Sequence, residues 1–192
     1  MTRNVLVFCG ASDAVDVVFK DAAFAIGRAI GERGGGVVYG GHHAGLMGAV
    51  ADGCRGAGGP VLGILPDVLR GKEHPPEGIE LVRVADMHAR KALMVEKSDV
   101  IIALPGGYGT LDELFEQLTW RVIGVHQKPV GMLDVLHNGK SYWQPLLFFL
   151  DHAVDEGFIR RAARDVLFVD ADVGGLLDRL GIEATAASSA PP

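Results

Sequence analysis

The chain alternates between short apolar runs and longer segments in which apolar residues recur every three or four positions. The short runs are rich in Val, Ile and Leu and are apolar on both faces, which is typical of parallel strands covered by helices on both sides. The longer segments have the spacing of amphipathic helices. Strands are expected at residues 4–9, 37–39, 61–65, 81–84, 100–104, 129–133 and 166–169, and helices at 46–57, 87–97, 109–123, 142–156 and 173–180, with a further long helix capped by Ser12 or Asp13.

Strands that alternate with helices predict an α/β protein. Right-handed crossovers then give a Rossmann-like three-layer fold, in which a mostly parallel sheet of about seven strands carries helices on both faces. The ligand crevice of such a sheet lies outside the carboxyl ends of its strands, where the strand order reverses. We expect a single domain over residues 1–182, because no linker is long enough to separate two, and a flexible tail over residues 183–192.

Composition limits the classes of function. Hydrophobic residues make up 48% of the 192 residues, enough for a substantial core, and the net charge is −6. That charge argues against a broad nucleic-acid surface, which needs a basic face. No run approaches the roughly 20 apolar residues that span a bilayer, and the first apolar run is too short for a signal peptide. Cys9 and Cys54 suggest no disulfide framework. We therefore expect a cytoplasmic protein without nucleic-acid or membrane partners.

The most informative stretch is PGGYGTLDE, from Pro105 to Glu113, directly after the strand at 100–104. Its glycines let a ligand lie against bare backbone. Thr110 is a favourable N-cap, and Glu113 follows it at the spacing of a capping box. The first N–H groups of the helix lack internal partners and carry partial positive charge, so a phosphate is expected there. A tight turn that binds nothing is the alternative.

A second glycine-rich turn, GGHHAG at residues 40–45, follows the strand at 37–39. Since both turns follow strands of one parallel sheet, they should open on the same edge. The histidines show no spacing with carboxylates that is typical of a metal site, so no metal is expected. Spacing alone favours exposed surface positions for Arg90 and Lys91.

Four motifs together resemble the Lonely Guy (LOG) family, which is often mislabelled as lysine decarboxylases. They are FCGAS, GGHHAGLMGAVADG, MHARK and LPGGYGTLDE, and the similarity covers residues 4–158. The resemblance implies hydrolysis of the N-glycosidic bond of adenosine 5'-monophosphate-type nucleotides, such as AMP and N6-prenyl-AMP cytokinin ribotides, to the free base and ribose 5-phosphate. It also implies that no cofactor is needed, and that a homodimer forms in which residues of both subunits complete each active site.

The resemblance further implies roles for individual residues. Arg90 and Glu113 match the catalytic pair. Glu113 would bind the ribose and activate water, and Arg90 would hold the phosphate or the departing base. Met87 and Met94 are candidates for an apolar slot for the base, with a plain core position as the alternative. His42 replaces a family glycine, where it could clash with the phosphate or bond to it; the alternative is that His42 and His43 are exposed loop residues. The implied substrate-binding residues are Glu73, Lys91, Gly107, Tyr108, Gly109, Thr110, Leu111, Asp112, Thr119, Gly41 and Gly45.

Other functions remain open at this point. A nucleotide-binding or molybdenum-cofactor-binding protein without turnover would share the fold, but the intact pair of Arg90 and Glu113 disfavours it. A lysine decarboxylase would need pyridoxal phosphate on a lysine within a much larger fold. A scaffold role is disfavoured by the dense glycines of the crevice.

Overall fold

The structure is a computed structural model that describes residues 3–69 and 78–183. In these residues one seven-stranded sheet has the order β4-β3-β2-β1-β5-β6-β9, and all neighbouring strands are parallel. This confirms the expected α/β fold. The strands are β1 (Asn4–Phe8), β2 (Gly36–Tyr39), β3 (Val61–Pro66), β4 (Glu80–Val84), β5 (Val100–Ala103), β6 (Val130–Leu133) and β9 (Leu167–Asp170).

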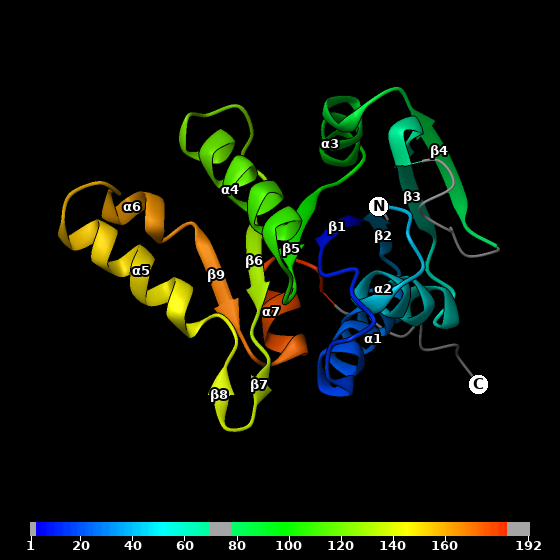
Figure 1. The fold of residues 1–192 in the computed structure, drawn as a ribbon, viewed down its shortest axis with the longest axis horizontal. Helices are drawn as coiled ribbons and strands as arrows, with labels where there is room; N and C mark the ends of the chain where they lie inside the picture. Colours follow the sequence, from blue (N-terminus) through cyan, green and yellow to red (C-terminus); the bar gives the residue numbers. More distant parts are fainter. Residues whose placement is uncertain (1–2, 70–77, 184–192) are drawn as a thin grey trace, which may run out of the picture.

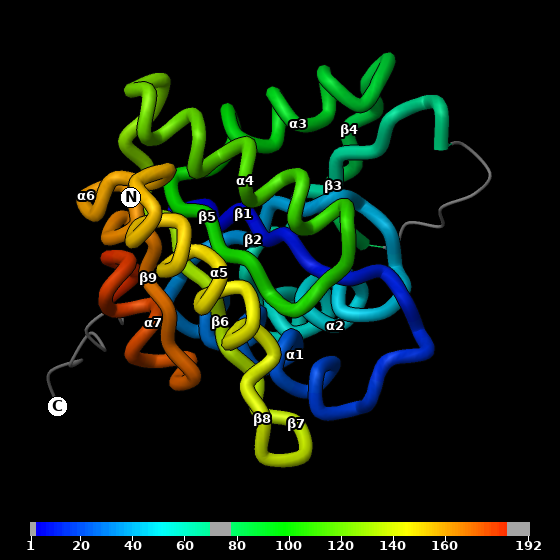
Figure 2. Tube along the Cα trace, turned by 60° about the vertical axis from the view of Figure 1, so that its left-hand side comes forward, coloured from blue at the N-terminus to red at the C-terminus, as the bar shows by residue number. Residues whose placement is uncertain are grey.

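Helices cover both faces of the sheet (Figures 1 and 2). One core joins the sheet to α1, α2 and α7, and the other joins it to α3, α4 and α5. Along β1, Val5 and Val7 lie in the first core, whereas Leu6 and Phe8 lie in the second. Burial on both faces explains why the strand sequences are apolar throughout. The helices are α1 (Val17–Glu32), α2 (Gly45–Gly56), α3 (Met87–Glu96), α4 (Tyr108–Val122), α5 (Gln144–Asp155), α6 (Arg161–Arg164) and α7 (Val173–Arg179).

The strand order reverses at β1, which pairs with β2 on one side and with β5 on the other. The turns that follow β1 and β5 are therefore in contact. The N–H of Gly10 donates to the carbonyl of Pro105 at 3.0 Å, and a Cβ added to Gly10 would lie 3.4 Å from the Cα of Gly106. Ligands of open α/β sheets bind at this kind of position.

The predicted start of the first long helix is wrong. α1 begins at Val17, and its N-cap is Asp16, whose carboxylate accepts from the N–H of Val18 at 3.0 Å. Asp13 instead accepts from the N–H of Gly45 at 2.9 Å. A tertiary hydrogen bond to the second glycine turn thus occupies the side chain that was expected to cap the helix.

The predicted capping box of Thr110 and Glu113 is also wrong. The N-cap of α4 is Gly107, so Thr110 lies within the first turn of the helix. Thr110 is buried. A Cβ added to Gly106 would lie only 2.1 Å from the hydroxyl oxygen of Thr110, so the two residues are closely packed. Packing beneath the turn, rather than capping, therefore determines where Thr110 lies.

A short antiparallel hairpin precedes α5 and was not predicted (Figure 1). Its strands are β7 (Leu136–His137) and β8 (Lys140–Ser141). Asn138 and Gly139 connect them with positive φ angles of 50° and 72°. Such a turn favours Asn-Gly, so the sequence does carry a signal for this hairpin.

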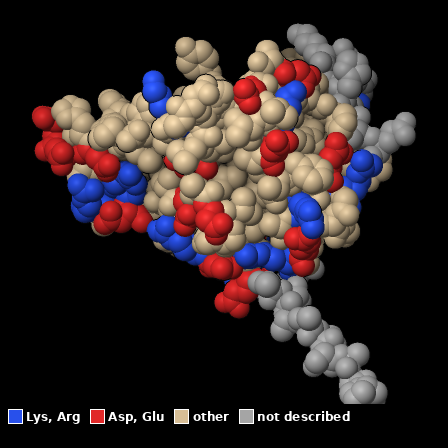
Figure 3. Space-filling model, turned by 90° about the horizontal axis from the view of Figure 1, so that it is seen from below, with Lys and Arg blue, Asp and Glu red and all other residues tan. Residues whose placement is uncertain are grey.

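Charges are mixed on the face seen in Figure 3, where acidic and basic side chains are interspersed without a continuous basic surface. Among the described helices, none combines the length and the apolar character needed to cross a membrane. Of the tail expected over residues 183–192, all but Glu183 lies outside the described residues.

Candidate active site

A cavity of about 490 Å³ lies where the strand order reverses. It is bounded by the turns after β1, β2 and β5 and by side chains from the helices on both faces of the sheet. The cavity therefore occupies the crevice that the topology of the sheet predicts. The residues that matter most for its chemistry are Gly10, Gly40, Gly106, Arg90, Thr110 and Glu113.

Arg90 is buried in this cavity rather than exposed. Its Nε donates to the carbonyl of Ile64 at 3.1 Å, and its Nη2 donates to the carbonyl of Gly40 at 2.8 Å. The expectation of a surface position is wrong because α3 follows β4, so the first turn of α3 lies at the carboxyl edge of the sheet. Two backbone hydrogen bonds then hold the guanidinium in one orientation.

Glu113 lines the same cavity and lies one helical turn after Thr110 in α4. Burial raises the pKa of its carboxyl group to about 7, the nearby Arg90 opposes this rise, and the neighbouring Asp112 adds to it. A carboxyl group with that pKa exchanges its proton near neutral pH, which suits a general base or acid.

Cys9 is a second titratable group in the wall of the cavity, next to Glu113. Burial raises the pKa of its thiol far above the usual range, and the charge of Glu113 adds to the effect. A neutral thiol is a poor nucleophile. The arrangement therefore favours chemistry at Glu113 over chemistry at Cys9.

The amino-terminal end of α4 opens into the cavity. Gly107, Gly109 and Thr110 line it, and the N-cap Gly107 makes no side-chain capping hydrogen bond. A Cβ added to Gly107 or Gly109 would meet nothing within 4 Å. Unpaired N–H groups at the start of a 15-residue helix, next to open space, are suited to an anion.

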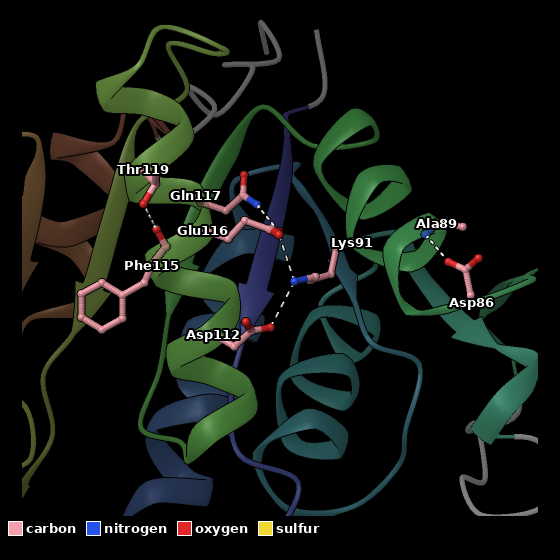
Figure 4. Close-up of polar contacts among 8 residues, drawn as sticks. All are labelled: Asp86, Ala89, Lys91, Asp112, Phe115, Glu116, Gln117 and Thr119. Carbon is pink, nitrogen blue, oxygen red and sulfur yellow. Dashed lines mark hydrogen bonds and ion pairs between the residues drawn. The ribbon is translucent and has the colours of Figure 1, made fainter.

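Lys91 does not line the cavity. Its ammonium group forms ion pairs with Asp112 at 3.1 Å and with Glu116 at 2.9 Å (Figure 4). Figure 4 shows both carboxylates reaching from α4 toward α3. Lys91 and Asp112 thus join two helices, each of which carries one member of the Arg90–Glu113 pair.

Several other residues expected to bind substrate also lie outside this cavity. Tyr108 is 94% exposed, and the hydroxyl of the exposed Thr119 donates to the carbonyl of Phe115 at 2.7 Å on the outer side of α4 (Figure 4). Leu111 packs against the core beneath α4. Glu73 lies outside the described residues.

The second glycine turn, at residues 40–45, accepts a hydrogen bond from Arg90 beside the cavity through the carbonyl of Gly40. Gly41 and Gly45 have φ angles of +82° and +56°, which residues with side chains rarely adopt. His42 is partly buried in the same turn but is not part of the cavity lining. Of this turn, Gly40 lines the cavity, and a Cβ there would lie 1.9 Å from the Nη2 atom of Arg90.

The two methionines expected to form a base slot differ. Met94 is buried and lines the cavity. Met87 is 38% exposed, and its Sδ atom lies 3.9 Å from the Nη1 atom of Arg90. Met94 therefore remains a candidate for the apolar slot for the base, whereas Met87 contacts the guanidinium of Arg90 and does not line the cavity.

Sequence reasoning missed two aromatic residues of the cavity, Phe19 and Tyr142. The hydroxyl of Tyr142 donates to the carbonyl of Gly106 at 2.6 Å, and its ring meets Phe19 edge-on at 5.7 Å. Nothing in the spacing of the sequence joins positions 19, 106 and 142. Only the Asn-Gly signal of the preceding hairpin hints that the chain turns back here.

Within the described part of the chain, no group of three His, Cys, Asp or Glu residues could hold a metal ion. Arg90 and Glu113 are instead close enough to interact electrostatically. The chemistry that this cavity can perform with its own residues is proton transfer and charge stabilisation next to a bound anion.

Comparison with known proteins places this geometry in context. A family model described as "Possible lysine decarboxylase" matches residues 47–180. A probable cytokinin riboside 5'-monophosphate phosphoribohydrolase of Oryza sativa subsp. japonica is 44% identical over 93% of this chain and 72% of its own length. A cytokinin riboside 5'-monophosphate phosphoribohydrolase of Arabidopsis thaliana is 47% identical over 88% of this chain and 72% of its own.

Solved structures resemble the fold as well. The molybdenum cofactor binding protein of the phototrophic bacterium Rippkaea orientalis superposes with a TM-score of 0.70 over 94% of this chain and 96% of its own. The molybdenum cofactor carrier protein of Chlamydomonas reinhardtii gives a TM-score of 0.69 over 94% and 97%. Their identities of 21% and 22% support a shared fold alone.

Proposed function

The chain belongs to the LOG family of cytokinin riboside 5'-monophosphate phosphoribohydrolases, and from this premise we propose that it hydrolyses the N-glycosidic bond of AMP-type nucleotides. The products are the free base and ribose 5-phosphate, and N6-prenyl-AMP cytokinin ribotides belong to the same substrate class. One observation carries the proposal: Arg90 and Glu113 share a single cavity with the open amino-terminal end of α4.

The phosphate is assigned to the start of α4. Gly107, Gly109 and Thr110 offer backbone N–H groups and a hydroxyl beside open space, and the helix dipole favours a negative charge there. Glu113 lies one turn further along α4, so a ribose attached to that phosphate reaches its carboxylate. The base then extends toward Met94 on α3, on the apolar side of the cavity.

The reaction follows from the charges. Departure of the base leaves positive charge on the ribose ring, as in glycoside cleavage. The carboxylate of Glu113 stabilises that charge, binds a ribose hydroxyl and takes a proton from the attacking water. A pKa of about 7 leaves a useful fraction of Glu113 ionised and still basic near neutral pH.

Arg90 is assigned to the departing base. Its Nε and Nη2 atoms already donate to the carbonyls of Ile64 and Gly40, so the fork formed by these two atoms is not available to a phosphate. Its positive charge beside Glu113 instead favours the ionised carboxylate and the negative charge that develops on the base nitrogens as the bond breaks.

A homodimer with shared active sites is part of the proposal. Val122, Ile123 and Phe158 are 52%, 67% and 88% exposed, and they border a groove of about 490 Å³ on the outer side of α4, to which Thr119 also contributes. A cluster of exposed apolar side chains of this kind marks an interaction surface. Thr119 lies outside its own cavity, so it would act in the site of the second subunit.

We propose that the protein binds small nucleotides and does not bind nucleic acids. The interspersed charges of Figure 3 support this choice, because nucleic-acid surfaces need a basic patch. We also propose the cytoplasm as the compartment, since the free thiols of Cys9 and Cys54 suit a reducing environment.

The proposal is tested by incubating the purified protein separately with AMP, N6-prenyl-AMP, GMP, CMP and lysine. We expect adenine and ribose 5-phosphate from AMP in equal amounts, and the corresponding products from prenyl-AMP. AMP that stays bound and intact would contradict hydrolysis and support a binding protein of the same fold. Formation of cadaverine from lysine would support the lysine decarboxylase hypothesis instead.

A further inference from the structure

Tyr142 connects the hairpin before α5 to the turn that begins α4. Its hydroxyl donates to the carbonyl oxygen of Gly106 at 2.6 Å, across 36 positions of sequence. Both residues line the cavity. The hydrogen bond thus ends on the peptide unit that leads into the expected phosphate site.

The peptide between Gly106 and Gly107 is unusually easy to rotate. Neither residue has a Cβ, so both orientations of the peptide plane are sterically accessible. The C=O and N–H of one trans peptide point in opposite directions. Fixing the carbonyl of Gly106 therefore also fixes the direction of the N–H of Gly107, the N-cap of α4.

The neighbouring carbonyl is bound in the same way. The oxygen of Pro105 accepts from the N–H of Gly10 at 3.0 Å. The carbonyl oxygens of Pro105 and Gly106 are thus both paired with protein donors. An unpaired carbonyl turned toward a phosphate would repel it, because its oxygen carries partial negative charge.

The ring of Tyr142 is itself held in place. It meets Trp143 edge-on at 4.9 Å and Phe19 edge-on at 5.7 Å, and its own N–H donates to the carbonyl of Val135 at 3.1 Å. Trp143 is buried, and its Nε1 donates to the carbonyl of Leu133 at 3.1 Å. The position of the hydroxyl is therefore set by packing before any ligand arrives.

We infer that Tyr142 is a positioning residue for the substrate phosphate: its hydroxyl holds the Gly106–Gly107 peptide with the carbonyl paired and the N–H available to the anion. The inference rests on the proposed function, since it takes a phosphate to be bound at the start of α4. It assigns Tyr142 to recognition of the phosphate and not to the chemical step.

Tyr142→Phe tests this, because the variant keeps the ring between Phe19 and Trp143 and removes only the hydroxyl. We expect the Kd of AMP, measured by calorimetry, and the KM for AMP to rise about tenfold, the scale of one lost hydrogen bond. The kcat for AMP and the kcat/KM for adenosine, which lacks the phosphate, should stay at the wild-type values.

Ser141→Ala is the matched control. It removes the hydrogen bond that the Ser141 hydroxyl of the same hairpin accepts from the N–H of Gln144 at 2.9 Å, and it leaves the ring of Tyr142 and the bond to Gly106 in place. We expect a lower Tm with a wild-type Kd for AMP. A tenfold weaker Kd in this control as well would overturn the inference, because loosening of the hairpin would then suffice.

Two other results would overturn the role of Tyr142. They are a wild-type Kd and KM for AMP in Tyr142→Phe, and an equal loss of kcat/KM for AMP and for adenosine. A wild-type protein that binds AMP without releasing adenine would overturn the proposed function alone, and the comparison of Kd values would still decide on Tyr142.

Discussion

At the scale of single residues, burial acts on two acidic groups of one cavity with different consequences. It raises the pKa of the Cys9 thiol so far that the thiol stays neutral. It raises the pKa of Glu113 only to about 7, with Arg90 opposing the rise. Burial thus keeps the Cys9 thiol protonated and places the pKa of Glu113 near neutral pH, where proton transfer is most effective.

The pKa of Glu113 predicts the pH dependence of the reaction. Since the ionised carboxylate is the working form, kcat/KM for AMP should rise with pH, with a midpoint near 7. The profile is measured from the rate of adenine release between about pH 5 and pH 9. A profile that is flat, or that falls through this range, would contradict the assignment of Glu113 as the base.

Thermal stability provides an independent check of the same pKa. A pKa raised by folding makes ionised Glu113 a cost to the folded state, which appears as the pH rises from the ordinary value of 4.5 to about 7. Glu113→Gln should therefore have a higher Tm than the wild type at pH 8, and this difference should shrink toward pH 4.5.

A substitution at Gly40 tests whether the reaction depends on the orientation of the Arg90 guanidinium. In Gly40→Ala the new Cβ would lie 1.9 Å from Nη2 of Arg90, so the guanidinium must move. We expect kcat/KM for AMP to fall about 100-fold, the scale of a displacement of about 1 Å in a catalytic group, while circular dichroism shows a folded protein.

The control for this variant is Gly56→Ala, at the end of α2, where an added Cβ meets nothing within 4 Å. It should keep wild-type kcat/KM. Wild-type activity in Gly40→Ala would show that the hydrogen bond to Gly40 has no role in the reaction.

At the scale of elements, α3 and α4 are joined beside the cavity by Lys91, Asp112 and Glu116 (Figure 4). The Lys91 side chain is only 14% exposed. Its positive charge lowers the pKa of Glu113, whereas the two carboxylates raise it. The ion-paired group thus sets the spacing of two helices and the charge around Glu113.

Lys91→Gln is expected to move the rising limb of the pH profile to higher pH, because Asp112 and Glu116 then act on Glu113 unopposed. Asp112→Asn, the matched variant, should move the limb to lower pH. Adenine release from AMP across the pH range measures both. If Lys91→Gln raised KM for AMP without moving the limb or changing turnover of adenosine, Lys91 would instead bind the phosphate.

The sequence predicts elements better than the contacts between them. The seven apolar runs identify all strands of the sheet, and the strand-turn positions of Gly40 and Gly106 predict a common edge. The capping of α4 by Gly107 and the bond from Tyr142 to Gly106 depend on tertiary packing. Spacing along one chain carries no information on such contacts.

At the scale of the whole molecule, two surfaces differ in character. The carboxyl edge of the sheet holds the cavity, whereas the outer side of α4 carries exposed apolar side chains, among them Ile123 and Phe158. Leaving that surface in water is unfavourable. In the proposed homodimer, a second subunit covers this surface and brings Thr119 toward the cavity of its partner.

Phe158→Glu should therefore give a monomer, since a charge in the apolar surface opposes association, and it should lower kcat/KM for AMP at least about tenfold because each site loses its partner residues. Sedimentation equilibrium measures the mass. Val17→Glu, on the exposed side of α1, is the control and should keep both the mass and the activity. A Phe158→Glu monomer with full activity would show that each chain is catalytically complete.

The dependence of hydrolysis on the Glu113 carboxylate is tested by following labelled AMP with the wild type and with Glu113→Gln side by side. We expect the wild type to convert AMP to adenine and ribose 5-phosphate, and Glu113→Gln to bind AMP in the cavity and leave it intact. Release of adenine by Glu113→Gln at the wild-type rate would contradict the proposed mechanism, because the reaction would then not depend on the carboxylate beside Arg90.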